Sequence, residues 1–296
     1  MSARKKQSPL WLESRLRTTE ILMHDSVLPT GATRLDDLIT YHFESGGSRT
    51  RAKLALSSAQ ALGLPDRSCV ALAACCELIH NASLLHDDIQ DQDSQRRSRA
   101  SAWHRFDVNT AMCAGTLLLS GAYRALAGVA SGSAELTKHA HQRTTDLIAG
   151  QVLDLMSHQD PPDLDHYLHI ATGKSGSLLA LPLELSLIAA REQASLPMAT
   201  NAGHALARAY QIIDDMGDVD IDLSQGHNNV VGVLMRGGVG REAAMARASA
   251  LANEHLSQAT THARWLPASS GHALVQVCEQ LQASMSASHA LDGRAA

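Results

Sequence analysis

The sequence contains few aromatic side chains. Phe, Trp and Tyr make up 3% of its 296 residues, whereas hydrophobic residues as a whole make up 45%. A core built mainly from Ala, Leu, Ile and Val favours close-packed helices over a sheet, so we expect an all-α fold. No linker divides the chain. We therefore predict one helical domain over residues 11–286, between a disordered tail (1–10) and a frayed tail (287–296).

The sequence also lacks a basic excess, a long uncharged apolar run and paired cysteines. The net charge is −5, and the basic residues form no stripe with interleaved aromatics, which argues against a nucleic-acid partner. No run of ~18 apolar residues is free of charge, so we expect no integral membrane segment and a soluble, cytoplasmic protein. The five cysteines are odd in number and lack metal-site spacing, so we expect buried free thiols.

The most informative stretch runs from Leu84 to Arg97 and overlaps the end of a helix predicted over residues 68–90. A helix places Asp87 and Asp91 one turn apart on the same face, with Asp88 beside Asp87. Carboxylates this close need a compensating cation, and Mg²⁺ prefers oxygen ligands of this kind. Taken alone, the cluster would also suit a solvated helix end.

A second aspartate motif lies far downstream, on a helix predicted over residues 199–217. Asp214 and Asp218 are again one turn apart, and Asp215 follows Asp214. Two apolar helices that both end in this pattern are difficult to explain as solvent-exposed helix ends without a function. If they face each other across a cavity, they can hold several Mg²⁺ ions and clamp one diphosphate between them.

Two further segments, Gly150–Leu155 and Lys174–Gly176, lie between these motifs. With all four in this order, residues 46–231 resemble the trans-isoprenyl diphosphate synthase (polyprenyl synthetase) family. The resemblance implies a single-domain helical bundle of the isoprenoid synthase type around a central cavity, and a homodimer. It also implies a prenyltransferase of isoprenoid biosynthesis, whose substrates are an allylic prenyl diphosphate and isopentenyl diphosphate.

The resemblance implies roles for single residues as well. Three Mg²⁺ ions would be held by Asp87, Asp91 and Asp214, supported by Asp88, Asp215 and Asp218. Arg96 and Lys174 would neutralise the allylic diphosphate. The acceptor diphosphate would be bound by Arg49, Arg51 and Arg97. Arg49 and Arg51 follow a Gly46–Gly47 turn, and Arg97 follows the aspartates of the first motif. Other positions expected at the substrate site are Gln151, Ser175 and Gln211.

The sequence departs from the family pattern at three positions that would contact diphosphates. Ser48 and His227 replace lysines, and Trp103 replaces a histidine. We therefore keep two alternatives to chain elongation. The same ionising site could serve a non-phosphorylated acceptor or a class I terpene cyclase. The chain could also be a non-catalytic subunit of a heteromeric synthase.

Two small residues, Ala82 and Ser83, lie about one helical turn before Asp87. In the family, large aromatic side chains at these positions close the cavity and stop elongation early. Small side chains here imply a product of geranylgeranyl length or longer. Simple packing of Ala82 and Ser83 against a neighbouring helix is the alternative interpretation.

Overall fold

The structure, a computed structural model, describes residues 9–129, 132–157 and 162–292, and almost all of them are helical. The predicted all-α fold is confirmed. The chain forms two compact units, one of Met1–Lys138 with Ile188–Arg191 and one of His139–Leu187 with Glu192–Ala296. Most of the predicted N-terminal tail lies outside the described residues, and the proposed domain boundaries remain predictions.

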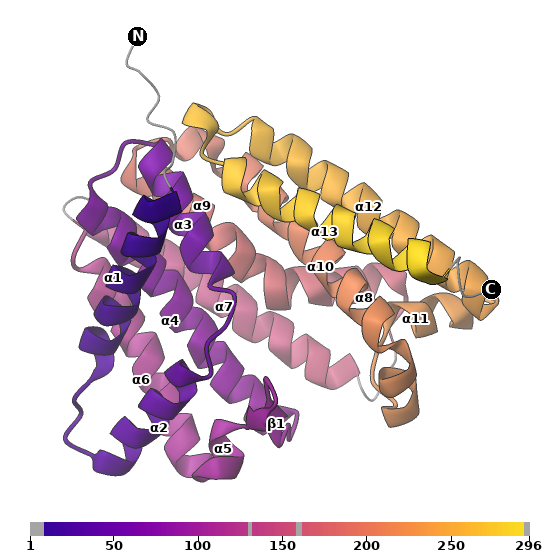
Figure 1. The fold of residues 1–296 in the computed structure, drawn as a ribbon, viewed down its shortest axis with the longest axis horizontal. Coiled ribbons are helices and arrows are strands. Elements are labelled where there is room, and N and C mark those ends of the chain that lie inside the picture. Colours follow the sequence, from indigo (N-terminus) through magenta and orange to yellow (C-terminus); the bar gives the residue numbers. More distant parts are fainter. Residues whose placement is uncertain (1–8, 130–131, 158–161, 293–296) are drawn as a thin grey trace. The chain divides into compact units, whose positions relative to one another are not determined.

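The first unit contains six helices and a short hairpin among the described residues (Figure 1). They are α1 (Pro9–Val27), α2 (Thr33–Glu44), α3 (Thr50–Ala61), α4 (Asp66–Gln90), β1 (Gln95–Arg96), β2 (Arg99–Ala100), α5 (Ala102–Arg105) and α6 (Val108–Leu126), followed by the start of α7 (Ser133–Ser157).

Helix α4 is the centre of this unit, and α1, α3 and α6 pack against it. It is apolar on nearly all sides, which is typical of a core helix. Leu72, Leu78 and Leu85 are at most 1% exposed. By length and composition α4 could cross a membrane, but 83% of its most apolar window is buried inside the protein. The helix that carries the first aspartate motif is therefore held on several sides by its own unit.

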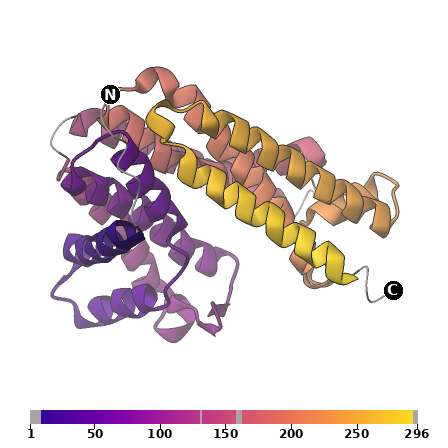
Figure 2. The ribbon, with the colours of Figure 1, turned by 45° about the horizontal axis from the view of Figure 1, so that its top comes forward.

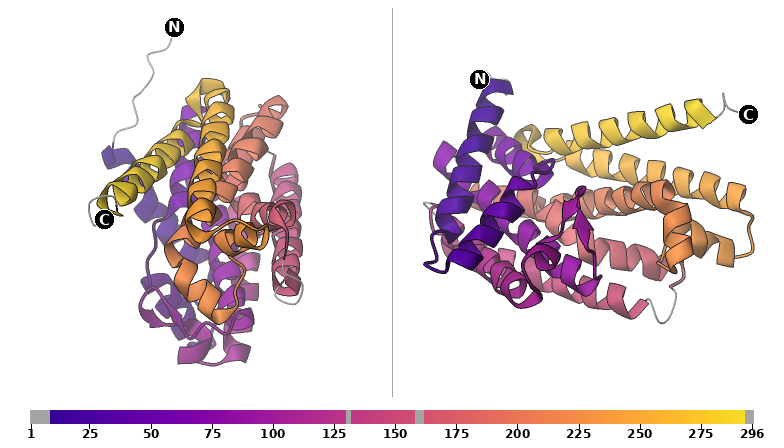
Figure 3. Two further views of the ribbon diagram at one scale, coloured as in Figure 1. Left: turned by 90° about the vertical axis from the view of Figure 1, so that its right-hand side faces the viewer. Right: turned by 60° about the horizontal axis from the view of Figure 1, so that its bottom comes forward.

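The second unit contains the rest of α7 and the following elements. They are α8 (Leu164–Ala171), the π-helical turn η1 (Thr172–Gly176), α9 (Ser177–Ala189), the 3₁₀ turn η2 (Gln193–Ser195), α10 (Leu196–Gln225), α11 (Val230–Arg236), α12 (Arg241–Arg264), the 3₁₀ turn η3 (Pro267–Ser269) and α13 (His272–Asp292). Helix α12 packs along both α10 and α13, and α12 and α13 form an antiparallel pair (Figures 2 and 3).

Two helices extend further than the sequence predicted. Helix α10 passes through Gly217 and ends at Gly226, which has φ 75° and closes the helix in the left-handed conformation. A glycine such as Gly217 has low helix propensity but can still be accommodated inside a helix, whereas a glycine in the left-handed conformation commonly ends one. Helix α13 continues past residue 286 to Asp292, because no helix breaker occurs before Gly293.

A buried ion-pair network joins α7, α9 and α10 in the second unit. Glu184 is fully buried, and its carboxylate accepts hydrogen bonds from Arg143 at 2.5 and 2.8 Å. His139 lies 2.8 Å from the same carboxylate, and Thr200 donates to it. Burial alone would raise the pKa of Glu184, but the hydrogen bonds from His139, Arg143 and Thr200 outweigh it and lower the pKa to about 2.

We predict that Glu184→Gln lowers the free energy of unfolding by about 3 kcal/mol, because Arg143 would keep its buried charge without a full partner. The loss should be measured by urea denaturation at neutral pH. It should shrink as the pH falls from 4.5 towards about 2, since the carboxylate takes up a proton near pH 4.5 in the unfolded chain but only near pH 2 in the folded wild type. Asp146→Asn is the control, because Asp146 pairs with the same arginine but is 33% exposed. A loss equal to that of Glu184→Gln in this control would contradict the prediction.

Candidate active site

The first aspartate motif lies at the C-terminal end of α4. Asp87 is half-buried in the last turn, and Asp91 is the exposed C-cap residue, whose N–H donates to the carbonyl of Asp87 at 2.8 Å. Asp88 between them is only 1% exposed. The helix therefore directs its middle carboxylate into the protein and leaves the outer two closer to solvent.

Asp88 is held by Arg96. The Arg96 Nε donates to Asp88 Oδ1, while Asp88 Oδ2 is buried and has no hydrogen-bond partner among the described residues. Burial raises the pKa of Asp88 to about 6, although the Arg96 charge opposes this shift. Arg96 was predicted to contact the allylic diphosphate, and the structure gives it a partner within the motif.

Arg96 belongs to the hairpin β1–β2, whose strands pair Gln95 with Ala100 and Arg96 with Arg99. Arg97 and Ser98 form the turn with φ of 52° and 61°. Positive φ at both central residues is typical of the tightest hairpin turns, and it costs a residue other than glycine roughly 1–2 kcal/mol. The two neighbouring arginines contact different groups: Arg96 contacts Asp88, and Arg97 contacts Ser45 and Gly46.

Arg97 contacts the glycine turn before α3. Its Nη1 donates to the Gly46 carbonyl and lies 3.3 Å from Ser45 Oγ. Gly47 has φ 134°, a conformation that residues other than glycine rarely adopt, and a Cβ atom there would lie 2.7 Å from the Arg97 guanidinium, which would have to move. The predicted turn therefore exists, and the positive φ of Gly47 explains the glycine.

Arg97 also borders a cavity of about 20 Å³, which we call the anion pocket. Its lining consists of Gly47, Ser48, Arg49, Thr50, Arg51, Glu77, His80, Asn81 and Arg97. Burial, together with the charges of Arg49 and Arg96, lowers the pKa of Arg97. All three arginines predicted for the acceptor diphosphate line this pocket, and guanidinium groups suit bidentate contacts to phosphate.

Sequence reasoning missed three residues of α4 that line the pocket: Glu77, His80 and Asn81. Glu77 is 2% exposed and accepts from the backbone N–H of Ala52 at 2.9 Å, so it caps the first turn of α3. Burial, followed by the charges of nearby arginines, places the pKa of His80 well below its ordinary value. The available signal was three polar side chains spaced by one turn in an otherwise apolar helix.

His42, on α2, supports this polar group from outside the pocket. Burial lowers its pKa to about 4, so the ring is neutral and its Nε2 donates to Asn81 Oδ1 at 3.0 Å. Asn81 in turn donates to the Glu77 carbonyl at 2.7 Å. The side chains facing the pocket are therefore fixed by a hydrogen-bonded chain through α2 and α4.

Two of the departures from the family pattern have their own partners. Ser48 Oγ lies 2.8 Å from Thr50 Oγ1. The Trp103 Nε1 donates to the carbonyl of Asp93 at 2.8 Å, and Trp103 is not among the residues that line the anion pocket. Trp103 thus ties α5 to the loop after the first motif.

The second aspartate motif lies on α10. Asp214 and Asp218 are exposed, whereas Asp215 is 4% exposed. Asp215 accepts from Tyr167 Oη at 2.8 Å, from the Val230 N–H at 2.7 Å and from Gln211 Nε2 at 2.8 Å. Burial raises the pKa of Asp215 to about 6 against these hydrogen bonds. Both Asp215 and Gln211 therefore stabilise the unit that carries Asp214.

The length of α10 brings in a further aspartate, Asp222, which lies beyond the predicted end of the helix at residue 217. Asp222 lies one turn beyond Asp218 on the face of Asp214. Burial raises the pKa of Asp214, and the charges of Asp218 and Asp222 add to the shift. Asp222 accepts from Asn229 at 2.8 Å, and His227 Nδ1 lies 3.8 Å from it.

Lys174 lies in the π-helical turn η1 and is paired inside the protein. Its Nζ donates to Asp154 Oδ2, on α7, at 2.7 Å. The two segments touch through glycines, since a Cβ atom at Gly150 would lie 2.5 Å from the backbone of Gly173. Lys174 was predicted to bind a substrate diphosphate, and Asp154 already supplies the anion that a half-buried ammonium needs.

Gln151 and Ser175 are adjacent to this pair in sequence. Gln151 is 7% exposed, and neither its amide nitrogen nor its amide oxygen has a hydrogen-bond partner among the described residues. Ser175 is half-buried. A buried amide with both atoms unpaired is uncommon and is a reason to examine Gln151 as a ligand-binding group.

The donor chemistry of both motifs fits a divalent cation, because each presents two accessible carboxylates one turn apart. Within the described ranges no three His, Cys, Asp or Glu side chains converge closely enough to hold a metal alone. Mg²⁺ usually takes one or two carboxylates and completes its shell with water and phosphate oxygens. The residues present are thus suited to a metal that arrives with a diphosphate.

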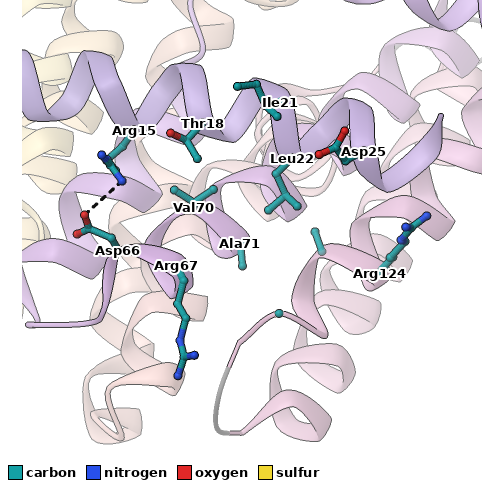
Figure 4. A pocket seen from close by; sticks show the side chains of 12 residues that line it. Arg15, Thr18, Ile21, Leu22, Asp25, Asp66, Arg67, Val70, Ala71 and Arg124 are labelled. Carbon is teal, nitrogen blue, oxygen red and sulfur yellow. Dashed lines mark ion pairs between the residues drawn. The ribbon is translucent and has the colours of Figure 1, made fainter. Parts of the chain in front are cut away.

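A larger cavity of about 560 Å³ lies elsewhere in the first unit, between α1, α4 and the end of α6 (Figure 4). Its apolar lining includes Leu22, Val70 and Ala71, and Arg15 pairs with Asp66 at one end. No residue of the aspartate motifs or of the anion pocket lines it, so it is separate from the candidate active site.

Comparison with known proteins decides the family. The family model described as Polyprenyl synthetase matches residues 32–232. The chain belongs to the polyprenyl synthetase family. Both aspartate motifs and the anion pocket of this polyprenyl synthetase family member lie inside the matched range.

Curated relatives of this family member include a geranylgeranyl diphosphate synthase of Mycobacterium tuberculosis, 32% identical over 58% of the chain and 50% of the relative. An all-trans-nonaprenyl-diphosphate synthase of Rhodobacter capsulatus is 33% identical over 66% of the chain and 60% of the relative. The chain thus spans about half to three fifths of the length of these relatives.

Solved structures agree on the fold. The geranylgeranyl pyrophosphate synthetase of the archaeon Geoglobus acetivorans superposes with a TM-score of 0.83 at 21% identity, covering 91% of this chain and 98% of that one. A decaprenyl diphosphate synthase of Rhodobacter capsulatus gives 0.83 at 21% identity, over 92% and 96% of the two chains. The isoprenoid synthase type of helical fold is therefore confirmed.

We predict that Asp215→Ala and Asp214→Ala separate the structural and ligand-binding roles within the second motif. Asp215→Ala should lower the free energy of unfolding by about 3 kcal/mol, because it leaves the buried Val230 N–H and Tyr167 hydroxyl without a partner. Asp214→Ala should change it by less than about 0.5 kcal/mol, since Asp214 is exposed and faces other carboxylates. Thermal and urea unfolding of both variants, without metal, would show the difference. Equal losses would contradict it.

Proposed function

We propose that this protein is a Mg²⁺-dependent trans-prenyltransferase. It would ionise an allylic prenyl diphosphate and join the resulting carbon chain to isopentenyl diphosphate, giving a trans-prenyl diphosphate of geranylgeranyl length or longer. The observation that carries the proposal is the matched construction of the two motifs. In each, a buried middle aspartate is held by hydrogen bonds, and two further aspartates one turn apart are left accessible.

Asp87, Asp91 and Asp214 would hold three Mg²⁺ ions, with Asp88, Asp215 and Asp218 in support. Bound Mg²⁺ supplies positive charge that stabilises a diphosphate leaving group as its carbon–oxygen bond breaks. The protein's own part is to keep the accessible carboxylates charged and in place. Arg96 does so through Asp88, and Tyr167 and Val230 do so through Asp215.

The anion pocket would bind the diphosphate of the acceptor. Arg51 and Arg97 offer guanidinium groups, and a neutral His80 can donate one hydrogen bond without adding charge. The names of the relatives, which are prenyl diphosphate synthases, support an acceptor with a diphosphate. A homodimer, which rests on the family resemblance, and a cytoplasmic location, which rests on the lack of an uncharged run of ~18 apolar residues, belong to the same proposal.

An altered acceptor is the second candidate function, and Ser48 and Trp103 favour it. Neither side chain supplies the group that the family places there, and both are hydrogen-bonded within the protein. The ionising half would then serve a non-phosphorylated acceptor or a cyclisation.

The deciding experiment incubates purified protein with Mg²⁺ and geranyl, farnesyl or geranylgeranyl diphosphate, each with and without isopentenyl diphosphate. We expect longer prenyl diphosphates by mass spectrometry only when isopentenyl diphosphate is present. EDTA should abolish them, and so should Asp87→Ala or Asp214→Ala, which remove carboxylates proposed to hold Mg²⁺. Light scattering on the same sample would report the dimer.

Asp146→Asn, at a carboxylate outside both motifs, is the matched control and should retain activity. A hydrocarbon or alcohol formed regardless of isopentenyl diphosphate would favour the altered acceptor or the cyclase. Full activity of Asp87→Ala would contradict the proposed ionisation.

We predict that Ser83→Phe and Ala82→Phe act differently. Ser83 is half-buried, whereas Ala82 is 0% exposed and already fully packed. Ser83→Phe should shorten the main product, because the aromatic ring would enter the proposed substrate cavity beside α4 and leave less room for the growing chain. Ala82→Phe should lower the free energy of unfolding by about 1–3 kcal/mol through overpacking. Product analysis and urea denaturation of both variants test this, and an unchanged product from a well-folded Ser83→Phe would contradict it.

A further inference from the structure

Arg49 is held by a contact that lies outside the anion pocket. Its Nε donates to Glu20 Oε1, on α1, at 3.0 Å, and the arginine side chain is only 14% exposed. Glu20 does not line the anion pocket. Together with Arg49 it lines a separate cavity of about 160 Å³, whose other residues are Met23, His24, Phe43 and Glu44. Arg49 therefore lies between two cavities, with Glu20 in the outer one.

The backbone of Arg49 depends on such a contact. Arg49 is the N-cap of α3, has φ 51°, and makes no side-chain capping hydrogen bond. A residue other than glycine keeps this left-handed conformation only where its surroundings fix it. The ion pair with Glu20 supplies a fixed point for the side chain. The conformation in turn directs the start of α3, which carries Arg51.

The contact also reaches Arg97. The Arg49 Nη1 lies 3.4 Å from the Gly46 carbonyl, and the same carbonyl accepts from Arg97. Glu20 is thus linked to Arg97 through Arg49 and Gly46. Because Ser48 brings no positive charge, the positive charge of the pocket's lining comes from these arginines and Arg51. The placement of Arg49 therefore affects every cation of the pocket.

We propose that Glu20 is a positioning residue for the acceptor diphosphate, acting through its ion pair with Arg49 on the Gly46–Arg49 turn. This inference rests on the proposed function, since it describes how the acceptor site of that function is held in shape. Glu20 itself does not touch substrate. Its loss is expected to weaken acceptor binding and to leave the ionising half of the reaction intact.

The test compares Glu20→Ala with Glu13→Ala in the elongation assay. Both glutamates lie on α1 and pair with an arginine, but the Glu13–Arg17 pair is exposed and far from the turn in sequence. We expect Glu20→Ala to raise KM for isopentenyl diphosphate about tenfold, with kcat and KM for the allylic substrate within about twofold. Glu13→Ala should change none of these constants. An unchanged KM for isopentenyl diphosphate in Glu20→Ala would overturn the proposal.

Two further variants separate positioning from general loss of structure. Glu20→Gln keeps an acceptor oxygen for Arg49 Nε and should recover part of the affinity. Arg49→Lys cannot contact Glu20 and Gly46 together, and Arg49 itself lines the pocket, so its effect should be at least as large as that of Glu20→Ala, and the double variant should be no worse than Arg49→Lys alone. Additive effects in the double variant would show that Glu20 and Arg49 act independently, and this would overturn the proposal.

A binding measurement keeps this inference distinct from the proposed function. Calorimetry with inorganic diphosphate in EDTA reports the arginine-lined pocket without the metal-dependent motifs. Glu20→Ala should weaken this binding about tenfold relative to wild type and Glu13→Ala, with Arg51→Ala as the variant that reduces it most. If wild type elongates nothing, the proposed function fails, and this measurement alone decides the role of Glu20. Equal affinities of wild type and Glu20→Ala would overturn that role.

Discussion

The buried middle carboxylate of each aspartate motif is the constraint on which the candidate site depends. Asp88 and Asp215 are 1% and 4% exposed, and a charged group at such a depth is costly unless hydrogen bonds or an opposite charge compensate it. Arg96 supplies the charge for Asp88, and Tyr167, Gln211 and Val230 supply the hydrogen bonds for Asp215. Successive helix positions are rotated by about 100°. Fixing the middle residue therefore fixes the direction of its accessible neighbours.

Glycines that allow a close approach to the backbone position two charged side chains of the candidate site. Gly150 and Gly173 touch, which brings Asp154 on α7 within 2.7 Å of Lys174 in η1. Gly47 similarly allows the Arg97 guanidinium to lie against the turn before α3. In both places a charged side chain is positioned by removing bulk from the opposing backbone. A methyl group at either glycine would displace a functional group by a clash with backbone or guanidinium atoms.

The parts of the site that follow from helical periodicity could be predicted from the sequence. Asp87 with Asp91, and Asp214 with Asp218, are spaced by four residues, and a helix places such residues on the same face. Contacts between elements could not be predicted in this way. The partner of Lys174 is on a different helix, and Glu77 caps a helix that begins far upstream of it. These pairings depend on packing angles and backbone contacts, which no local pattern contains.

Helix boundaries show the same limit on a smaller scale. The sequence suggested that the second aspartate helix ends at Gly217, but Gly226 is the residue in the left-handed conformation. Composition does not distinguish a glycine inside a helix from one that ends it. The continuation matters for the site, because it places Asp222 on the helical face of Asp214, where its charge helps raise the pKa of Asp214.

The departures at Ser48 and Trp103 suggested a weakened acceptor site when only the sequence was considered. In the structure these side chains bond to Thr50 and to the Asp93 carbonyl, so they serve the turn and the loop beside the site. The lining of the anion pocket retains three arginines, which recognise phosphate oxygens by paired, planar contacts that a single lysine does not make. A cavity bordered by three guanidinium groups favours an anionic acceptor over a neutral one. Under the proposed function, the absence of the lysine would therefore change how the acceptor diphosphate is held more than whether it is held.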